Sequence, residues 1–320
     1  MDIKYLFNFP TIKNLDDLAN KIQLSKYLIY HLTYNTKYFY KKVEKKKSQG
    51  GYRQLFCPSN KLKAVQAWIL RKILEYIPLE ENATAFRKGM NVRDNVEKHK
   101  ENKFILCLDI KNFFDNIPKK WVYNFYLKLG YNKHVSILLT NICTLEGHLP
   151  QGAVTSPSLS NILLKRLDRR ISGYAGKRNI TYTRYADDIA LSSNDPAILE
   201  NSKQFIINKI INDEGFKLNK AKTRMLRPGN RREITGLVIT DNDEVRIGRK
   251  TKKKIRAAIH HYIYGKKDVW QDHEELKQHI KGWMNFIKGV DEKSYKQLDK
   301  YRKKLKQKKI TEEAAATSEK

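Results

Sequence analysis

The spacing of apolar residues predicts helices towards both ends of the chain. Behind Asn14, a residue type that caps helices, apolar positions recur at helical intervals as far as Leu32, which predicts one helix there. A second helix is expected after Pro58. After residue 248 the pattern stays helical to about residue 308, whereas the segment 311–320 has no apolar periodicity and is expected to be disordered.

The middle of the chain carries the pattern of strands. The runs 38–47 and 52–57 flank a Ser-Gln-Gly-Gly turn and predict a hairpin. The run FILCLDI (104–110) is continuously apolar until it ends at an acid. This pattern indicates a buried strand with Asp109 at its edge.

A second hairpin is expected at TYTRYADDIALSS (181–193), folded about Ala186, Asp187 and Asp188. The periodicity also predicts helices at 118–129, 133–143, 157–172 and 196–213, and short strands at 222–227, 232–240 and 244–247. Strands and helices in mixed order, followed by a basic helical segment, indicate an α+β body with an all-α appendage.

The charge of the chain is strongly positive. Its 320 residues include 64 Lys or Arg and 34 Asp or Glu, for a net charge of +30, while 40% of residues are apolar and can form a core. A folded protein with this charge is expected to bind a polyanion, and nucleic acid is the leading candidate. No apolar stretch approaches the roughly 18 residues of a membrane span, and no leader pattern is visible, so we expect a soluble, cytoplasmic protein.

Three of the scarce acids occupy special positions in this pattern. Asp109 ends the buried strand, and Asp187 and Asp188 lie at the tip of the second hairpin. Carboxylates on neighbouring strands can share two Mg²⁺ ions roughly 3.5–4 Å apart, which activates an attacking hydroxyl and stabilises a leaving pyrophosphate. An adjacent Asp pair also favours tight turns, so the pattern alone leaves a purely structural explanation open.

Six segments together resemble the motifs of reverse transcriptases, in the same order and at similar intervals: YRQLFCPS (52–59), DIKNFFDNI (109–117), LPQGAVTSPSLSNILL (149–164), YADD (185–188), EGFKLNKAKT (214–223) and ITGLVI (234–239). The resemblance runs through roughly residues 35–250. It implies a right-hand polymerase with fingers (1–100), a palm of antiparallel sheet and helices (101–248) and an α-helical thumb (249–310), before the disordered tail.

The resemblance also implies a role for individual residues. Asp109, Asp187 and Asp188, with the backbone carbonyl of Ile110, would hold two Mg²⁺ ions, for which Mn²⁺ could substitute. Phe114 lies where the family has an aromatic gate against a ribose 2′-OH, and its alternative role is an ordinary core residue beside Phe113. The nucleotide site would comprise Arg53, Phe114, Gln151, Gly152 and Lys222, with Lys220 close enough to exchange roles with Lys222. Thr235 and Gly236 would support the primer end.

Two further segments resemble the retron subfamily. Retron enzymes carry Asn-Ala-x-x-His between fingers and palm, where this chain has Asn95 and His99, and Val-Thr-Gly near the primer grip, where it has Ile-Thr-Gly at 234–236. The resemblance implies that Asn95, His99, His260 and His261 contact RNA. A surface role for His99 within a charged run remains open.

The retron resemblance implies a definite reaction. The enzyme would bind a cognate structured noncoding RNA, prime from the 2′-OH of an internal guanosine and copy the adjoining RNA with dNTPs into branched RNA–DNA (msDNA). It would serve bacterial antiphage defence beside a separate effector protein. Two alternatives stay open: a diversity-generating, CRISPR-associated or intron-type reverse transcriptase, and a non-catalytic RNA-binding scaffold of polymerase shape.

Overall fold

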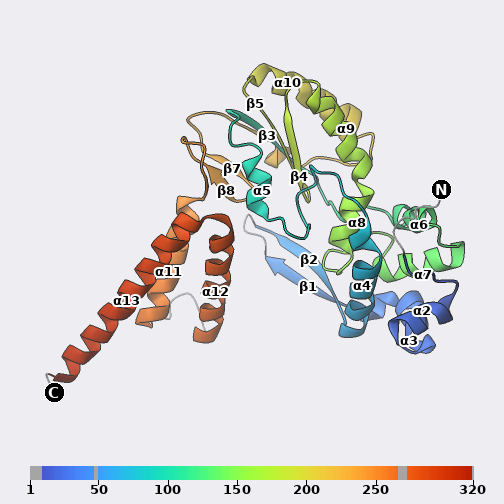
Figure 1. Ribbon diagram of the computed structural model, residues 1–320, viewed down its shortest axis with the longest axis horizontal. Coiled ribbons are helices and arrows are strands. Elements are labelled where there is room, and N and C mark those ends of the chain that lie inside the picture. The colour runs from blue at the N-terminus through green and yellow to red at the C-terminus, as the bar shows by residue number, and fades with distance from the viewer. Residues whose placement is uncertain (1–8, 47–49, 266–271, 319–320) are drawn as a thin grey trace.

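The computed structural model describes residues 9–46, 50–265 and 272–318 (Figure 1). Within these ranges the strands form three antiparallel sheets, of two, four and three strands, and helices surround them. None of the described helices combines the length and the apolar character that a bilayer-spanning segment requires. The mixture of antiparallel sheets and helices confirms the predicted α+β class.

The described residues 15–34 form two helices instead of the single one predicted there. Helix α2 (Leu15–Ile22) ends because Gln23 adopts a left-handed conformation, with φ of 60°. Helix α3 (Lys26–Tyr34) then begins afresh, with the Ser25 side chain capping it by accepting from the Leu28 amide. Apolar spacing continues across the break, which is why periodicity alone did not reveal it.

The first predicted hairpin is confirmed. A short 3-10 turn, η1 (Thr36–Phe39), leads into β1 (Tyr40–Lys46), which pairs with β2 (Tyr52–Pro58) over seven residues. Residues 47–49, including part of the expected first strand, lie outside the described residues. Helix α4 (Asn60–Lys72) and the turn η2 (Leu74–Tyr76) follow.

The central sheet has the strand order β4–β5–β3–β6. It comprises β3 (Phe104–Asp109), β4 (Thr181–Tyr185), β5 (Asp188–Ser193) and β6 (Arg224–Leu226). Leu106 and Leu108 of β3 face one buried cluster, whereas Ile105 belongs to another. Because both faces of the sheet are covered, β3 reads as a continuous apolar run.

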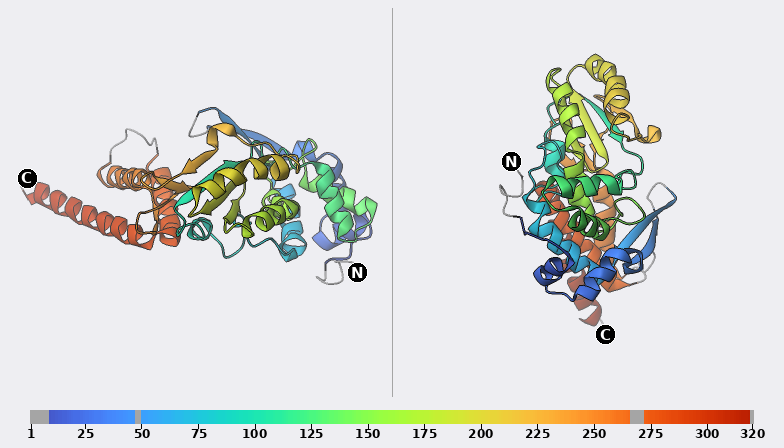
Figure 2. Two further views of the ribbon diagram at one scale, coloured as in Figure 1. Left: turned by 90° about the horizontal axis from the view of Figure 1, so that it is seen from above. Right: turned by 90° about the vertical axis from the view of Figure 1, so that its right-hand side faces the viewer.

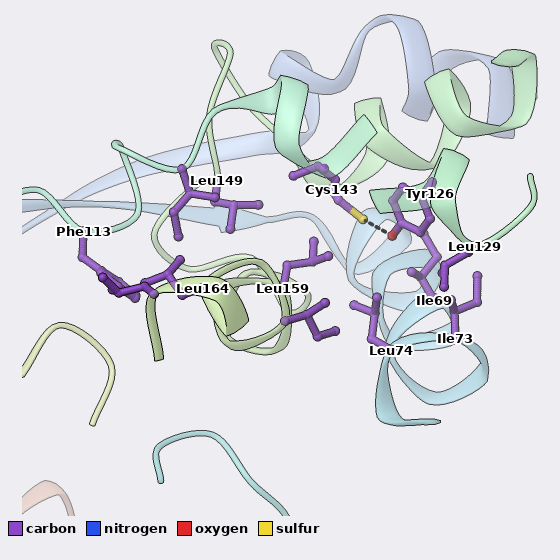
Figure 3. Close-up of a cluster of buried hydrophobic side chains, with 14 of the residues drawn as sticks. Ile69, Ile73, Leu74, Phe113, Tyr126, Leu129, Cys143, Leu149, Leu159 and Leu164 are labelled. Atoms are coloured by element: carbon purple, nitrogen blue, oxygen red, sulfur yellow. Dashed lines mark hydrogen bonds between the residues drawn. The ribbon is translucent and has the colours of Figure 1, made fainter. Parts of the chain in front are cut away.

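The middle of the chain also contains several helices and turns. They are α5 (Val92–Glu97), α6 (Lys119–Lys128), α7 (Lys133–Cys143), α8 (Ser156–Leu163), α9 (Lys165–Gly176), α10 (Pro196–Phe205), the π-helical turn η3 (Ile206–Ile211) and the 3-10 turn η4 (Lys220–Lys222). The single helix predicted at 157–172 is divided at Leu164. Figure 3 shows part of the first cluster, where Tyr126 Oη and Cys143 Sγ lie 3.4 Å apart.

The single strand predicted at 232–240 is a hairpin. Strands β7 (Arg232–Ile234) and β8 (Leu237–Ile239) are joined by Thr235 and Gly236, whose φ angles are 47° and 86°. Two consecutive positive φ values are what a tight two-residue turn requires. Strand β9 (Val245–Ile247) completes this sheet beside β8.

In the ranges 249–265 and 272–318, the structure describes three helices: α11 (Arg249–Tyr264), α12 (His273–Val290) and α13 (Glu292–Ser318). They share a buried cluster with β7, β8 and β9, so the packing runs across the boundary expected at residue 248. Helix α13 projects away from the body (Figures 1 and 2) and continues to Ser318. The prediction of a disordered tail was therefore wrong for residues 311–318. Alanines favour the helix there, and Glu312 and Glu313 pair with Lys308 and Lys309 one turn earlier.

Candidate active site

The tip of the β4–β5 hairpin presents two aspartates at the end of the central sheet. Ala186 turns the chain with a positive φ of 57°, and Asp187 follows it. The Asp187 carbonyl accepts a hydrogen bond from the Ile110 amide at 2.9 Å, and Asp188 stands opposite Asp109 in the β3–β5 register. The fold therefore brings the three predicted carboxylates to one end of the sheet.

A buried ion pair anchors this turn. Arg184 and Asp168 have no exposed side-chain surface, and Arg184 Nε and Nη2 donate to the two Asp168 oxygens at 2.7 Å. The Tyr182 hydroxyl donates to the same carboxylate, also at 2.7 Å. Arg184 Nη1 donates to the Ala186 carbonyl at 3.1 Å. Because the guanidinium is planar and bonds in fixed directions, the pair ties the turn to α9.

Asn95 and His99 were predicted to contact RNA, and that prediction is wrong. Their exposures are 1% and 0%. The His99 ring nitrogens lie 2.7 Å from the hydroxyls of Ser192 and Thr183, while Asn95 Oδ1 accepts from the Thr84 hydroxyl at 2.8 Å. Burial, with a smaller effect of the Lys98 charge, lowers the pKa of His99 to about 3, so its ring is neutral. The hydrogen bonds of His99 therefore hold the segment after α5 against the β4–β5 hairpin.

Burial, with the charges of neighbouring carboxylates, raises the pKa of two aspartates at the site. Burial, followed by the charges of Asp187 and Asp109, raises the pKa of Asp188 to about 6. Burial and the Asp109 charge also raise the pKa of Asp187. Lys222 Nζ donates to Asp109 Oδ2 at 2.7 Å, and this bond raises the pKa of Lys222. Acids that resist ionisation in this way favour a neighbouring cation, and Lys222 supplies one.

The side chains fit divalent cations in their chemistry. Among the described residues, no three His, Cys, Asp or Glu side chains converge as a ready-made metal cage. The available donors are nonetheless carboxylate and carbonyl oxygens, which hard cations such as Mg²⁺ prefer. The Lys222 ammonium group pairs with Asp109 at 2.7 Å, which shows that this carboxylate accepts a cation as its neighbour. The residues Asp109, Asp187, Asp188 and Ile110 could hold such ions.

A cavity of about 500 Å³ opens over this end of the sheet. It brings together most of the predicted nucleotide and metal residues: Arg53, Asp109, Ile110, Phe114, Gln151, Asp187 and Lys222. Strand β2 contributes one wall through Tyr52, Arg53, Gln54 and Phe56. Asp188 and Gly152 do not line the cavity, although both neighbour residues that do. The volume suits a ligand of nucleotide size.

Several residues of the cavity wall were not found by sequence reasoning: Lys111, Asn112, Asp115, Glu146 and His148. Asn112 has a positive φ of 50°, and the Lys111 amide donates to the Lys217 carbonyl at 2.8 Å. Proximity to Asp109 within one motif could have identified these two. Glu146 and His148 lie in a turn that periodicity does not mark, so only the tertiary structure assigns them to the wall.

Gly152 allows the loop before α8 to pack closely against β2 of the β1–β2 hairpin. The Phe56 amide donates to the Gln151 carbonyl at 2.8 Å. Gly152 has φ of +124°, and a Cβ added there would lie 2.6 Å from the Phe56 carbonyl oxygen. The close approach of two backbones therefore requires glycine.

We expect Gly152→Ala to reduce primer extension at least tenfold, because the added methyl group must displace β2 and the cavity wall that it carries. Single-nucleotide incorporation kinetics measure the effect. Gly215→Ala is the matched control: its φ is +83°, but no atom lies within 4 Å of the added carbon. If both variants lose the same activity, backbone strain rather than contact with Phe56 explains the glycine.

The other predicted residues lie apart from the cavity wall. Thr235 and Gly236 form the β7–β8 turn, and the Thr235 hydroxyl is buried without a hydrogen-bond partner among the described residues. His260 and His261 are partly exposed on α11, and the His260 ring stacks on Tyr264 with centroids 4.8 Å apart. Their roles stay predictions. Lys220 is exposed and outside the cavity wall, whereas Lys222 contacts Asp109.

An antiparallel sheet that carries carboxylates at one end, beneath a cavity walled by a basic hairpin, defines a nucleic-acid polymerase of the right-hand class. The family model of reverse transcriptase (RNA-dependent DNA polymerase) matches residues 43–285. The chain belongs to this family, and it is of the retron type, as its relatives show. Its activity is therefore RNA-directed DNA synthesis, with an RNA template and dNTP substrates.

Two curated relatives illustrate this similarity. Retron Ec86 reverse transcriptase of Escherichia coli is 38% identical over 301 residues, which cover 93% of this chain and 91% of the relative. Retron Mx65 reverse transcriptase of Myxococcus xanthus is 32% identical over 275 residues, covering 80% of this chain and 62% of the relative. Among solved structures, telomerase from Candida albicans in complex with a telomeric RNA fragment aligns with a TM-score of 0.49 and 11% identity, over 82% of this chain and 55% of that one.

Proposed function

We propose that this reverse transcriptase copies part of one cognate structured noncoding RNA into msDNA, primed from the 2′-OH of an internal guanosine in that RNA. The observation that carries the proposal is the 38% identity to a retron enzyme across nearly the whole length of both chains. The cavity above Asp109 and Asp187 supports it, since the catalytic side chains are present together. An intact set of carboxylates argues against a non-catalytic scaffold.

In this proposal Asp109, Asp187, Asp188 and the Ile110 carbonyl hold two divalent cations, Mg²⁺ or Mn²⁺. When bound, such ions lower the pKa of the attacking hydroxyl and neutralise the leaving pyrophosphate. Lys222 serves as the acid that protonates the pyrophosphate. The hydrogen bond to Asp109 raises the pKa of Lys222, so the amine is protonated and carries the proton that it would transfer.

The remaining residues bind and orient the substrates. Arg53 offers a planar set of donors to the triphosphate from the cavity wall. Gln151 and Gly152 pack against the nascent base pair, and Thr235 and Gly236 support the primer end. On the basic thumb, His260 and His261 contact the RNA.

The proposal extends to organisation and partners. Fingers, palm and thumb correspond to residues 1–100, 101–248 and 249–310. Strands β7–β9 belong to the palm by residue number, but they share a buried cluster with the thumb helices. An effector protein encoded separately acts with the enzyme and its msDNA in antiphage defence. The enzyme works in the bacterial cytoplasm, where its RNA is transcribed.

The direct test is to purify the protein from cells that express its neighbouring locus and to sequence the bound nucleic acid. We expect DNA joined to a guanosine through a 2′–5′ linkage, which a debranching enzyme converts to a faster-migrating species. Linear complementary DNA would instead indicate a diversity-generating, CRISPR-associated or intron-type enzyme. Bound RNA without any DNA would indicate a scaffold.

Phe114→Ala is expected to raise ribonucleotide incorporation about tenfold or more relative to deoxynucleotides. The ring lies on the cavity wall, in edge contact with Phe113 at a centroid distance of 5.2 Å, where it can exclude a 2′-OH. Competition between GTP and dGTP in single-nucleotide extension measures the ratio. Phe114→Tyr keeps the bulk and should keep the discrimination. Unchanged sugar selectivity in Phe114→Ala would assign Phe114 to the core alone.

A further inference from the structure

Four exposed tyrosines lie on α3 and on the η1 turn that directly follows it, at the N-terminal side of the fingers. Tyr27 and Tyr38 are 75% exposed, Tyr30 is 48% exposed and Tyr34 is 46% exposed. We call these four residues the tyrosine row. Large aromatic side chains gathered on a surface mark an interaction site more often than single exposed ones do. The catalytic cavity uses none of them.

The row on α3 is continuous and faces away from the core. Tyr27, Tyr30 and Tyr34 follow one another at helical spacing, while Ile29 and Leu32 of the same helix are fully buried. The Tyr30 and Tyr34 ring centroids lie 4.8 Å apart. His31 connects the remaining ring, with its centroid 4.3 Å from that of Tyr27 and 5.7 Å from that of Tyr30.

The surroundings of the row are basic. Lys37 Nζ lies 4.9 Å from the centroid of the Tyr38 ring, and Lys41 and Lys42 follow on the exposed part of β1. Lys26 pairs with Asp16 at 2.8 Å. Exposed aromatic rings interleaved with lysines suit a partner that combines flat bases with phosphates, rather than an apolar protein surface.

The row is close to the catalytic cavity along the chain. Lys42 of β1 pairs with Phe56 of β2, which lines the cavity. Tyr38 precedes Lys42 by four residues, a span of at most about 14 Å. Figure 1 shows α3 at the base of the β1–β2 hairpin that walls the cavity. A strand leaving the cavity along this hairpin would therefore reach Tyr38 first and then α3, which directly precedes η1.

We propose that the tyrosine row binds the single-stranded RNA template ahead of copying, by stacking its unpaired bases on the tyrosine rings. Bases in the RNA–DNA product are paired and stacked on their neighbours, so their faces cannot contact these rings. In an enzyme that copies RNA, the unpaired strand beside the cavity is the template that has not yet been read. Stacking on aromatic rings tolerates any base, as a moving template requires.

The affinity test uses an unstructured, fluorescently labelled RNA of about 12 nucleotides, a length that falls in the range of known single-strand sites. The triple variant Tyr27→Ala, Tyr30→Ala, Tyr34→Ala should raise the Kd at least tenfold by fluorescence anisotropy. The corresponding triple Phe variant keeps the rings and should bind within threefold of wild type. Tyr76→Ala removes a tyrosine of similar exposure, 53%, outside the row and should change nothing.

A second experiment locates the strand. Template RNA carrying 4-thiouridine ahead of the copied position should crosslink on irradiation to the peptide that contains α3, and the triple Ala variant should lose that crosslink. Melting temperatures show whether the variants fold. If the triple Ala variant does not fold, the single Tyr27→Ala variant is used in its place. An unchanged Kd for RNA in the triple Ala variant would overturn the proposal, and so would an equal loss of RNA affinity in the triple Phe variant. The same holds if the triple Ala variant loses a protein partner but keeps its RNA affinity. Binding is measured without catalysis, so the result is independent of the priming mechanism.

Discussion

Asp187→Asn is expected to lower primer extension by about 10³-fold or more, because metal-ion stabilisation of the transition state is worth several kcal/mol and depends on a charged ligand. The asparagine side chain is nearly isosteric and keeps the turn. Single-turnover extension of a primed RNA template by one dNTP measures the loss.

The same variant should not be less stable than wild type. Burial and the Asp109 charge raise the pKa of Asp187, which means that the fold disfavours its ionised form. A neutral asparagine therefore removes an unfavourable charge, and the melting temperature at pH 7 without added metal should stay the same or rise.

Asp213→Asn is the matched control. Asp213 makes a surface ion pair with Arg170 and has about half of its side chain exposed. Both activity and stability of this control should remain near wild type. If Asp187→Asn extends primers as well as the control does, the catalytic assignment is wrong and the scaffold alternative gains support.

Arg184→Met is expected to destabilise the protein by about 3–5 kcal/mol, since it leaves the Asp168 carboxylate buried with its charge unpaired. Thermal or urea unfolding measures the change. Arg170→Met, which breaks two partly exposed ion pairs, with Asp213 and Glu214, should cost less, about 1 kcal/mol. Equal effects in the two variants would contradict the importance of burial.

A double variant separates stability from positioning. Arg184→Met combined with Asp168→Leu leaves neither charge unpaired, so most of the lost stability should return. Primer extension should not return, because Arg184 Nη1 no longer bonds the Ala186 carbonyl and the turn that carries Asp187 loses its anchor. If activity recovers together with stability, Arg184 has only a structural role.

Residue periodicity alone determined much of the local structure. The pattern predicted β3 from its continuous apolar run, the β4–β5 hairpin from the alternation on either side of Ala186, and the first hairpin from the glycine turn before β2. The ordered motifs then indicated Asp109 and Asp187, and the charge of +30 indicated a nucleic-acid partner. The strands and helices can be predicted from the sequence because residues in a strand or helix return to the same environment at a fixed interval.

Periodicity failed where one backbone conformation decides the outcome. The apolar spacing continues through Gln23 and through Leu164, yet the helices end there. Thr235 and Gly236 turn the chain inside the segment 232–240, which the pattern predicts as one strand. Gln23, Thr235 and Gly236 are left-handed and Leu164 has non-helical angles, and one such residue redirects the chain without changing the spacing of apolar residues around it.

Only the tertiary structure decided burial and pairing between distant segments. It brought Asp109 opposite Asp188, set Lys222 rather than Lys220 against that first carboxylate, and enclosed His99 between two hydroxyls. Each outcome depends on strand register and on which helix covers which face of the sheet. Residue type and spacing specify neighbours a few positions apart, whereas the environment of a charged or polar group depends on everything that packs around it.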